Sequence, residues 1–148
     1  MPNLRHAFLL ALLALLTACT RTYYKDFAVD PQERTYSPRA QFEDIKGYLV
    51  SRGLRVLFES DGFIAVELET DSGASGRNKP SDSLQVRRTA DRVDLTLVRR
   101  SPGPDFLAGQ LKTFQETLEG RLRERSGHAV TIRLVDQRVS PISNVQFQ

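Results

Sequence analysis

Apolar residues follow a helical period in two stretches of the chain, separated by stretches in which apolar and polar residues alternate. The first helix is predicted to begin at Ser37-Pro38, because serine suits the N-cap and proline suits the first helical position. Phe42, Ile45 and Leu49 follow at spacings of three and four and therefore share one face. We expect this face to pack against a sheet.

The second helical stretch has the most regular pattern in the chain. Its apolar residues step by four, three, four and four, and they form one stripe: Leu107, Leu111, Phe114, Leu118 and Leu122. Arg123 and Arg125 occupy the last turn, where basic residues suit the helix dipole. Gly127 is expected to end the helix.

Five further stretches alternate apolar and polar residues with the two-residue period of strands. They lie at residues 54–59, 64–69, 84–86, 93–97 and 130–134. The predicted order of elements is therefore α-β-β-β-β-α-β. Successive hairpins favour an antiparallel sheet, so we predict an α+β domain with about five strands and both helices packed on one face.

Two turns are possible in the first hairpin. A two-residue turn at Asp61-Gly62 would set apolar residues of one strand against acidic residues of the other. A three-residue turn over residues 60–62 instead pairs apolar with apolar, Val56 with Val66 and Phe58 with Ile64. Because the buried face decides the register, we predict the three-residue turn.

Three segments lack a convincing period. Residues 19–36 are interpreted as a tether, residues 70–83 as a long polar loop, and residues 137–148 as a C-terminal tail. A loop of that length either serves binding or is simply flexible, and its Gly- and Ser-rich composition favours flexibility. The single folded domain is thus expected to span residues 37–136.

The N-terminus has a pattern of its own. Arg5 is followed by an apolar run over residues 7–16 and then by small residues up to Cys19. The run is shorter than the roughly 20 apolar residues that span a bilayer. A short charged region, an apolar run and small residues form the layout of a secretory signal.

The tetrapeptide Leu16-Thr17-Ala18-Cys19 resembles the lipobox of bacterial lipoproteins. The resemblance implies that residues 1–18 are a signal peptide and that the Cys19 sulfur carries a diacylglycerol. It also implies that the new amine is acylated, for example with palmitate; two or more chains anchor a protein stably. In that class an aspartate after the cysteine favours the inner membrane, so Thr20 favours the periplasmic face of the outer membrane.

Composition narrows the classes of function. The formal net charge is +3 and falls to +2 when Arg5 leaves with the signal, which is too weakly basic to suggest a nucleic-acid partner. The chain has no tryptophan, so an aromatic platform for sugars is not evident. Cys19 is the only cysteine, and its lipidation would leave the domain without disulfides.

Few residues in the predicted domain suggest catalysis. His128 follows the stop of a helix and is expected to be an exposed turn residue. Glu67 and Glu69 share one face of a strand and could act as an acid–base pair, but they serve more simply to keep that face soluble and to pair with Arg55. No Cys/His cluster or phosphate-cradling glycine loop is present, so we predict no cofactor, no metal and no enzymatic activity.

Arginines gather in the second hairpin and its flank: Arg87, Arg88, Arg92, Arg99 and Arg100. Such a cluster could bind phosphates of lipopolysaccharide or of anionic lipid, with Arg87 and Arg99 on the open sheet face. The simpler interpretation, which we favour, is a solvated strand face. That face would also carry Glu67, Glu69, Asp94 and Thr96.

These observations favour a membrane-anchored lipoprotein that acts as a non-catalytic accessory or binding module in the bacterial cell envelope. Its expected partner is an envelope protein, which would contact the open sheet face or an edge strand. The alternative is a binder of lipopolysaccharide or anionic lipid through the arginines, and an envelope hydrolase is a third, weaker possibility. The element order is loosely similar to helix-grip modules of some outer-membrane assembly lipoproteins, a likeness that carries no function.

Overall fold

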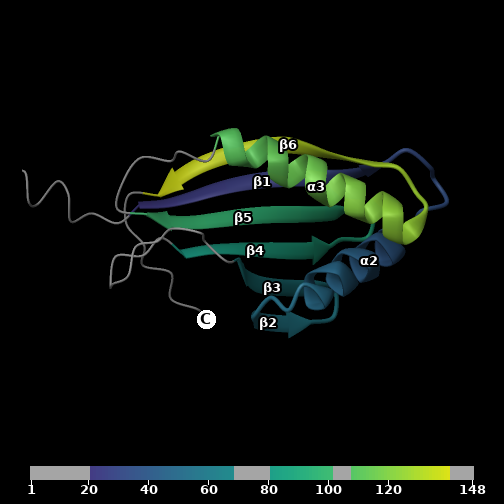
Figure 1. The fold of residues 1–148 in the computed structure, drawn as a ribbon, viewed down its shortest axis with the longest axis horizontal. Coiled ribbons are helices and arrows are strands. Elements are labelled where there is room, and N and C mark those ends of the chain that lie inside the picture. The colour runs from purple at the N-terminus through teal and green to yellow at the C-terminus, as the bar shows by residue number, and fades with distance from the viewer. Residues whose placement is uncertain (1–20, 69–80, 102–107, 141–148) are drawn as a thin grey trace, which may run out of the picture.

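Residues 21–68, 81–101 and 108–140 are described by the structure, a computed structural model. They form an α+β domain with a six-stranded antiparallel sheet and two helices, which confirms the predicted fold class (Figure 1). In chain order the elements are β1 (Arg21–Pro31), α2 (Pro38–Ser51), β2 (Val56–Ser60), β3 (Phe63–Leu68), β4 (Ser81–Arg88), β5 (Val93–Ser101), α3 (Ala108–Ser126) and β6 (Val130–Ser140).

The strands lie in the order β2-β3-β4-β5-β1-β6, and every neighbouring pair is antiparallel. Strands β2 to β5 follow one another as hairpins, as the alternating pattern predicted. The first strand of the chain then takes the place between β5 and β6 (Figure 1). The sheet therefore depends on pairing between segments that are far apart in the sequence.

Strand β1 corrects the interpretation of residues 19–36 as a tether. From Arg21 onward this segment pairs with β5 on one side and β6 on the other, and Phe27 and Val29 are each only 1% exposed. The pattern was hidden because both sheet faces carry charge here, Lys25 on one and Asp26 on the other. The domain thus includes β1 and does not begin at residue 37.

Two other boundaries also differ from the prediction. Strand β4 begins at Ser81, inside the stretch interpreted as a loop, and residues 69–80 lie outside the described part. Strand β6 continues to Ser140, so the first residues of the predicted tail pair with β1, whereas residues 141–148 are not described. Most of β6 is exposed, and beyond Leu134 its residues lack the alternation of a half-buried strand.

The first hairpin has the two-residue turn, so the predicted three-residue turn is wrong. Ser60 pairs with Phe63 across Asp61-Gly62, and Gly62 has a φ of 73°, which suits glycine. A β-bulge between Val56 and Phe58 adds a residue to β2, so Val56 still pairs with Val66. Phe58 instead opposes Ala65, on the open sheet face.

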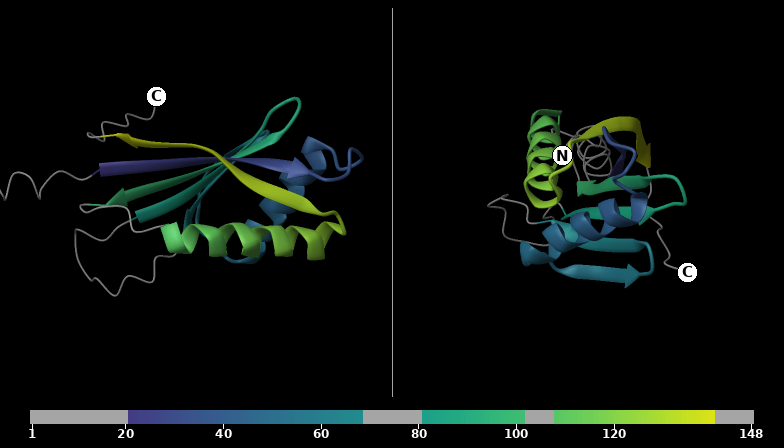
Figure 2. Two further views of the ribbon diagram at one scale, coloured as in Figure 1. Left: turned by 90° about the horizontal axis from the view of Figure 1, so that it is seen from above. Right: turned by 90° about the vertical axis from the view of Figure 1, so that its right-hand side faces the viewer.

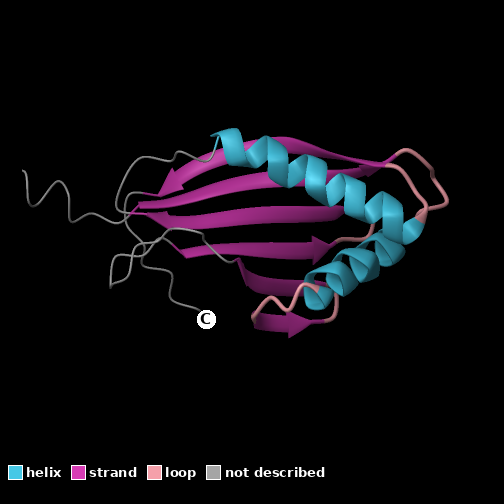
Figure 3. Cartoon of the chain, in the orientation of Figure 1, coloured by secondary structure: helices cyan, strands magenta, loops and turns pink. Residues whose placement is uncertain are grey.

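Both helices lie in front of the sheet in Figure 3 and pack on one core. Helix α2 contributes the predicted Phe42, Ile45 and Leu49, and its N-cap Ser37 accepts a hydrogen bond from the Ala40 amide at 3.3 Å. Helix α3 runs along the same side of the twisted sheet (Figure 2). It contributes Phe114, Leu118 and Leu122, while Leu107 and the side chain of Leu111 are outside the described part.

We predict that Phe27→Ala destabilises the domain by roughly 3–5 kcal/mol, because it empties a fully buried site in the core. The control is Leu57→Ala, since Leu57 is 49% exposed on the edge strand; its effect should stay within about 0.5 kcal/mol. Urea unfolding of the purified proteins gives both values. Equal effects of the two substitutions would mean that residues 21–31 are a tether after all.

Candidate binding site on the open sheet face

The sheet face away from the helices carries mainly polar and charged side chains. The register aligns them in rows across β3, β4, β5 and β1: Phe63, Arg87, Asp94 and Ala28, then Ala65, Gln85, Thr96 and Asp26, then Glu67, Ser83, Val98 and Tyr24. Arg87, Asp94, Thr96 and Glu67 were predicted on this face, and the register confirms them there. Arg55 lies 3.5 Å from Glu67, also as predicted, whereas Glu69 lies outside the described residues.

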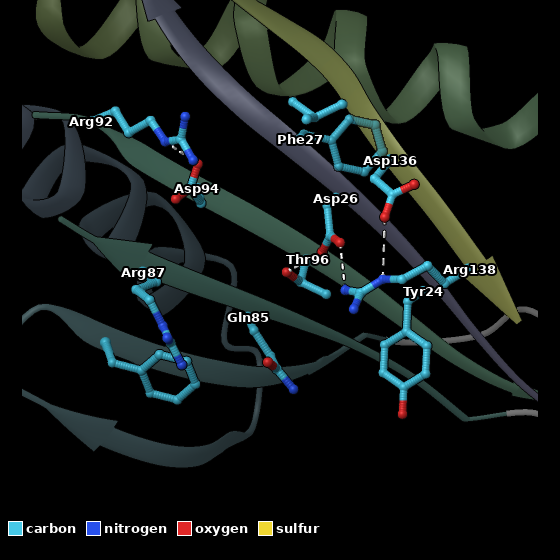
Figure 4. A pocket seen from close by; sticks show the side chains of 12 residues that line it. Tyr24, Asp26, Phe27, Gln85, Arg87, Arg92, Asp94, Thr96, Asp136 and Arg138 are labelled. Carbon is cyan, nitrogen blue, oxygen red and sulfur yellow. Dashed lines mark hydrogen bonds and ion pairs between the residues drawn. The ribbon is translucent and has the colours of Figure 1, made fainter. Parts of the chain in front are cut away.

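This face is hollowed by a groove of about 450 Å³ (Figure 4). Its charged lining consists of three arginines and three aspartates from four strands and a turn: Arg87, Arg92, Arg138, Asp26, Asp94 and Asp136. Tyr24, Gln85 and Thr96 add hydrogen-bonding groups, and Phe63 and Val135 add apolar surface. The opposite charges are equal in number, so the groove offers donors and acceptors in fixed places and no excess of one sign.

Arg138 organises one side of the groove. Its Nη2 donates to Asp26 Oδ2 at 2.5 Å, and its Nε lies 3.4 Å from Asp136 Oδ2. The guanidinium also lies 5.5 Å from the centre of the Tyr24 ring, a cation–π distance. Thr96 donates to the other oxygen of Asp26 at 2.6 Å, so β5, β1 and β6 are joined through one carboxylate (Figure 4).

Arg138 was not predicted as a site residue, because it lies in the segment interpreted as a tail. Its position is set by a bulge in the β1–β6 pairing, where Asp26 opposes Asp136 but Phe27 opposes Leu134. The extra residue, Val135, also lines the groove. A bulge bends its strand and increases the local twist. Reading Arg138 as a groove residue would have required the pairing of β6 with β1.

The five arginines of the second hairpin do not form one cluster. Arg87 lies in the groove with its guanidinium 5.6 Å from the Phe63 ring centre, and Arg92 lies there 2.9 Å from Asp94. Arg88 points to the helix face, 3.0 Å from Asp61 and 5.9 Å from the Phe42 ring centre. Arg100 is exposed at the end of β5.

Arg99 lies on the helix face and not on the open face, since it follows Leu97 by two residues in β5. Its Nε and Nη2 donate to the two oxygens of Asp82, both at 2.7 Å. The side chains are only 15% and 9% exposed, respectively. This bidentate pair joins β4 to β5 inside the domain and is unsuited to reaching an external ligand.

His128 lies in the turn between α3 and β6, where it was predicted, and its side chain is 33% exposed. Its Nδ1 is 2.9 Å from Glu33 Oε2, and its ring stacks on Tyr36 with centres 4.6 Å apart. Burial raises the pKa of Tyr36 to about 12, and its hydroxyl donates to Asp44 at 2.8 Å. His128 therefore ties this turn to the segment that follows β1.

Within residues 21–68, 81–101 and 108–140, no cluster of His, Cys, Asp or Glu side chains could hold a metal ion. Neither described helix has the length and apolarity needed to cross a bilayer. Compared with protein-family models and with curated proteins, the sequence shows no match. Function is therefore inferred from the residues and their geometry.

We predict that Asp82→Asn costs roughly 3–5 kcal/mol of stability, because it removes the negative charge that Arg99 binds with two hydrogen bonds in a largely buried pair. The matched control is Asp94→Asn, which breaks the more exposed pair with Arg92 and should cost at most about 1 kcal/mol. Chemical unfolding of both variants measures the difference. A similar small loss in both would contradict the structural role of the Arg99–Asp82 pair.

Proposed function

We propose that this chain is a lipid-anchored, non-catalytic binding module of the bacterial cell envelope, and that its groove docks a partner protein. The groove is the observation that supports this most. The helices cover one face of the sheet, whereas the other face holds a hollow with fixed donors and acceptors. A domain built in this way offers one broad surface for a partner.

The chemistry of the groove favours a protein over a strongly anionic ligand. Arg92 and Arg138 already contact carboxylates, and Arg87 rests on an aromatic ring. Protein interfaces combine paired charges with aromatic and apolar contacts, and such charges contribute more to specificity than to affinity. The alternative of lipopolysaccharide or anionic lipid bound by the five hairpin arginines loses support, because Arg88 and Arg99 lie on the other face.

The open face also suits a partner better than the sheet edges do. On β6, the backbone of Ile132 is occupied by α3: its amide donates to Glu119 at 2.6 Å, and its carbonyl accepts from Gln115 at 2.7 Å. The other edge, β2, has only five residues and contains the bulge. Short or bulged edge strands, and edges covered by a helix, resist the addition of a further strand.

The lipid anchor completes the proposal. Cys19 stands two residues before Arg21, where the sheet begins, so acylation would hold the domain directly at the membrane. The lipobox and Thr20 favour the periplasmic face of the outer membrane. In this position the module would present its groove to envelope proteins at a fixed, short distance from the bilayer.

A photo-reactive residue placed at Gln85, in the groove, is expected to cross-link to an envelope protein of one defined mass in intact cells. The matched control position is Thr117, which is exposed on α3. A second substitution, Arg138→Glu, should reduce the yield from Gln85 severalfold because it reverses a charge in the groove.

Immunoblotting and mass spectrometry of the adducts measure the outcome. No protein adduct from Gln85, or equal adducts from Gln85 and Thr117, would reject the groove as the docking surface.

A further inference from the structure

At one end of the sheet, β1 and β4 begin and β5 and β6 end. Arg21 pairs with Ser101, and Thr22 pairs with both Arg100 and Ser140. Arg100 also pairs with Ser81, the first residue of β4. We call this the anchor end, because it is the end of the sheet nearest Cys19 along the chain (Figure 1).

The anchor end has an excess of positive charge among the described residues. The three register rows that contain residues 21–23 of β1 hold three arginines, Arg21, Arg99 and Arg100, and one carboxylate, Asp82. Asp82 accepts hydrogen bonds from Nε and Nη2 of Arg99, while Arg21 and Arg100 are exposed.

The opposite end of the sheet is different, since its arginines sit beside carboxylates. Arg88 contacts Asp61, and Arg92 contacts Asp94. Arg133 contacts Asp30 at 2.9 Å. Among the described residues, carboxylates therefore offset the arginines at the opposite end of the strands, whereas positive charge is in excess where the chain leaves toward Cys19.

Chain geometry brings the anchor end close to the membrane if Cys19 carries lipid. An extended residue spans at most about 3.6 Å, so Arg21 would lie within about 7 Å of the anchored residue. Unlike a charge on a long tether, Arg21 would then be held within about one Debye length, roughly 8 Å, of the headgroups.

We propose that the anchor end docks on anionic phospholipid headgroups through Arg21 and Arg100, so that the strands run away from the bilayer and the groove faces sideways. This inference rests on the proposed lipidation of Cys19. A basic residue at an anionic surface changes a population ratio about fivefold. Two arginines would thus favour the docked over the undocked orientation by about 30-fold.

The absence of tryptophan from the sequence allows a direct test with single reporters. Ser101→Trp reports on the anchor end, with Val139→Trp as a second reporter, and Asp91→Trp reports on the distal hairpin turn. The lipidated protein, purified from membranes, is reconstituted into vesicles of brominated phosphatidylcholine with or without phosphatidylglycerol. Bromine quenches tryptophan only at close range.

Quenching at Ser101→Trp and Val139→Trp should rise with phosphatidylglycerol and fall with added salt, while Asp91→Trp stays unquenched. Replacing both Arg21 and Arg100 by Gln should lower the docked-to-undocked ratio about 30-fold. The matched control replaces Arg34 and Arg123 by Gln, the same charge change on exposed residues away from the anchor end.

If quenching does not change with phosphatidylglycerol, or falls equally in both double variants, the proposed docking is wrong, although the lipid anchor can still be correct. The intact mass of the same preparation shows whether acyl chains are present. Protein without them would overturn the proposed anchor and, with it, this inference.

Discussion

The pairing of β1 with β5 and β6 is the constraint on which the rest of the structure depends. Within the described residues β6 has no other strand beside it, and α3 is held to β6 through Gln115 and Glu119. β1 also brings Phe27 and Val29 into the core, where the Phe27 ring lies 6.2 Å from that of Phe114. Without β1 the sheet would stop at β5, and α3 would lose the surface it covers.

The same strand connects the core to the candidate site. Its residues alternate between the two faces, so Phe27 and Val29 enter the core while Tyr24 and Asp26 enter the groove. Asp26 accepts hydrogen bonds from Thr96 of β5 and Arg138 of β6. The groove is thus built on the best-paired strands of the domain, which keeps its charges in fixed positions. Because β1 begins two residues after Cys19, the proposed anchor would act directly on this framework.

Much of the fold could be predicted from the sequence. The apolar stripes of both helices and the alternation in β3 to β5 are strong signals, since one face of each of these elements is buried, whereas β2 is exposed throughout. The turn at Asp61-Gly62 was missed because the bulge that reconciles it with the apolar pairing leaves no mark in the pattern. Strand β1 was missed because Lys25 and Asp26 interrupt its alternation, one on each face.

The site was harder to predict than the fold. Arg87 and Arg92 were among the candidates and lie in the groove, but their partner region on β6, with Arg138, depends on a long-range pairing. Arg99 was different, because the sequence does contain the information: it follows Leu95 and Leu97 at the two-residue period and therefore shares their buried face. Applied strictly, the two-residue period of strands would have placed Arg99 on the buried face and Arg87 on the open face.

The central claim is that this domain is fixed by lipid at the very start of its sheet. The intact mass of the protein purified from cell membranes tests it most directly. The account predicts a chain that begins at Cys19 and carries the added mass of a diacylglycerol and a further acyl group. A chain that retains residues 1–18, or one that is cut without any lipid mass, would contradict it.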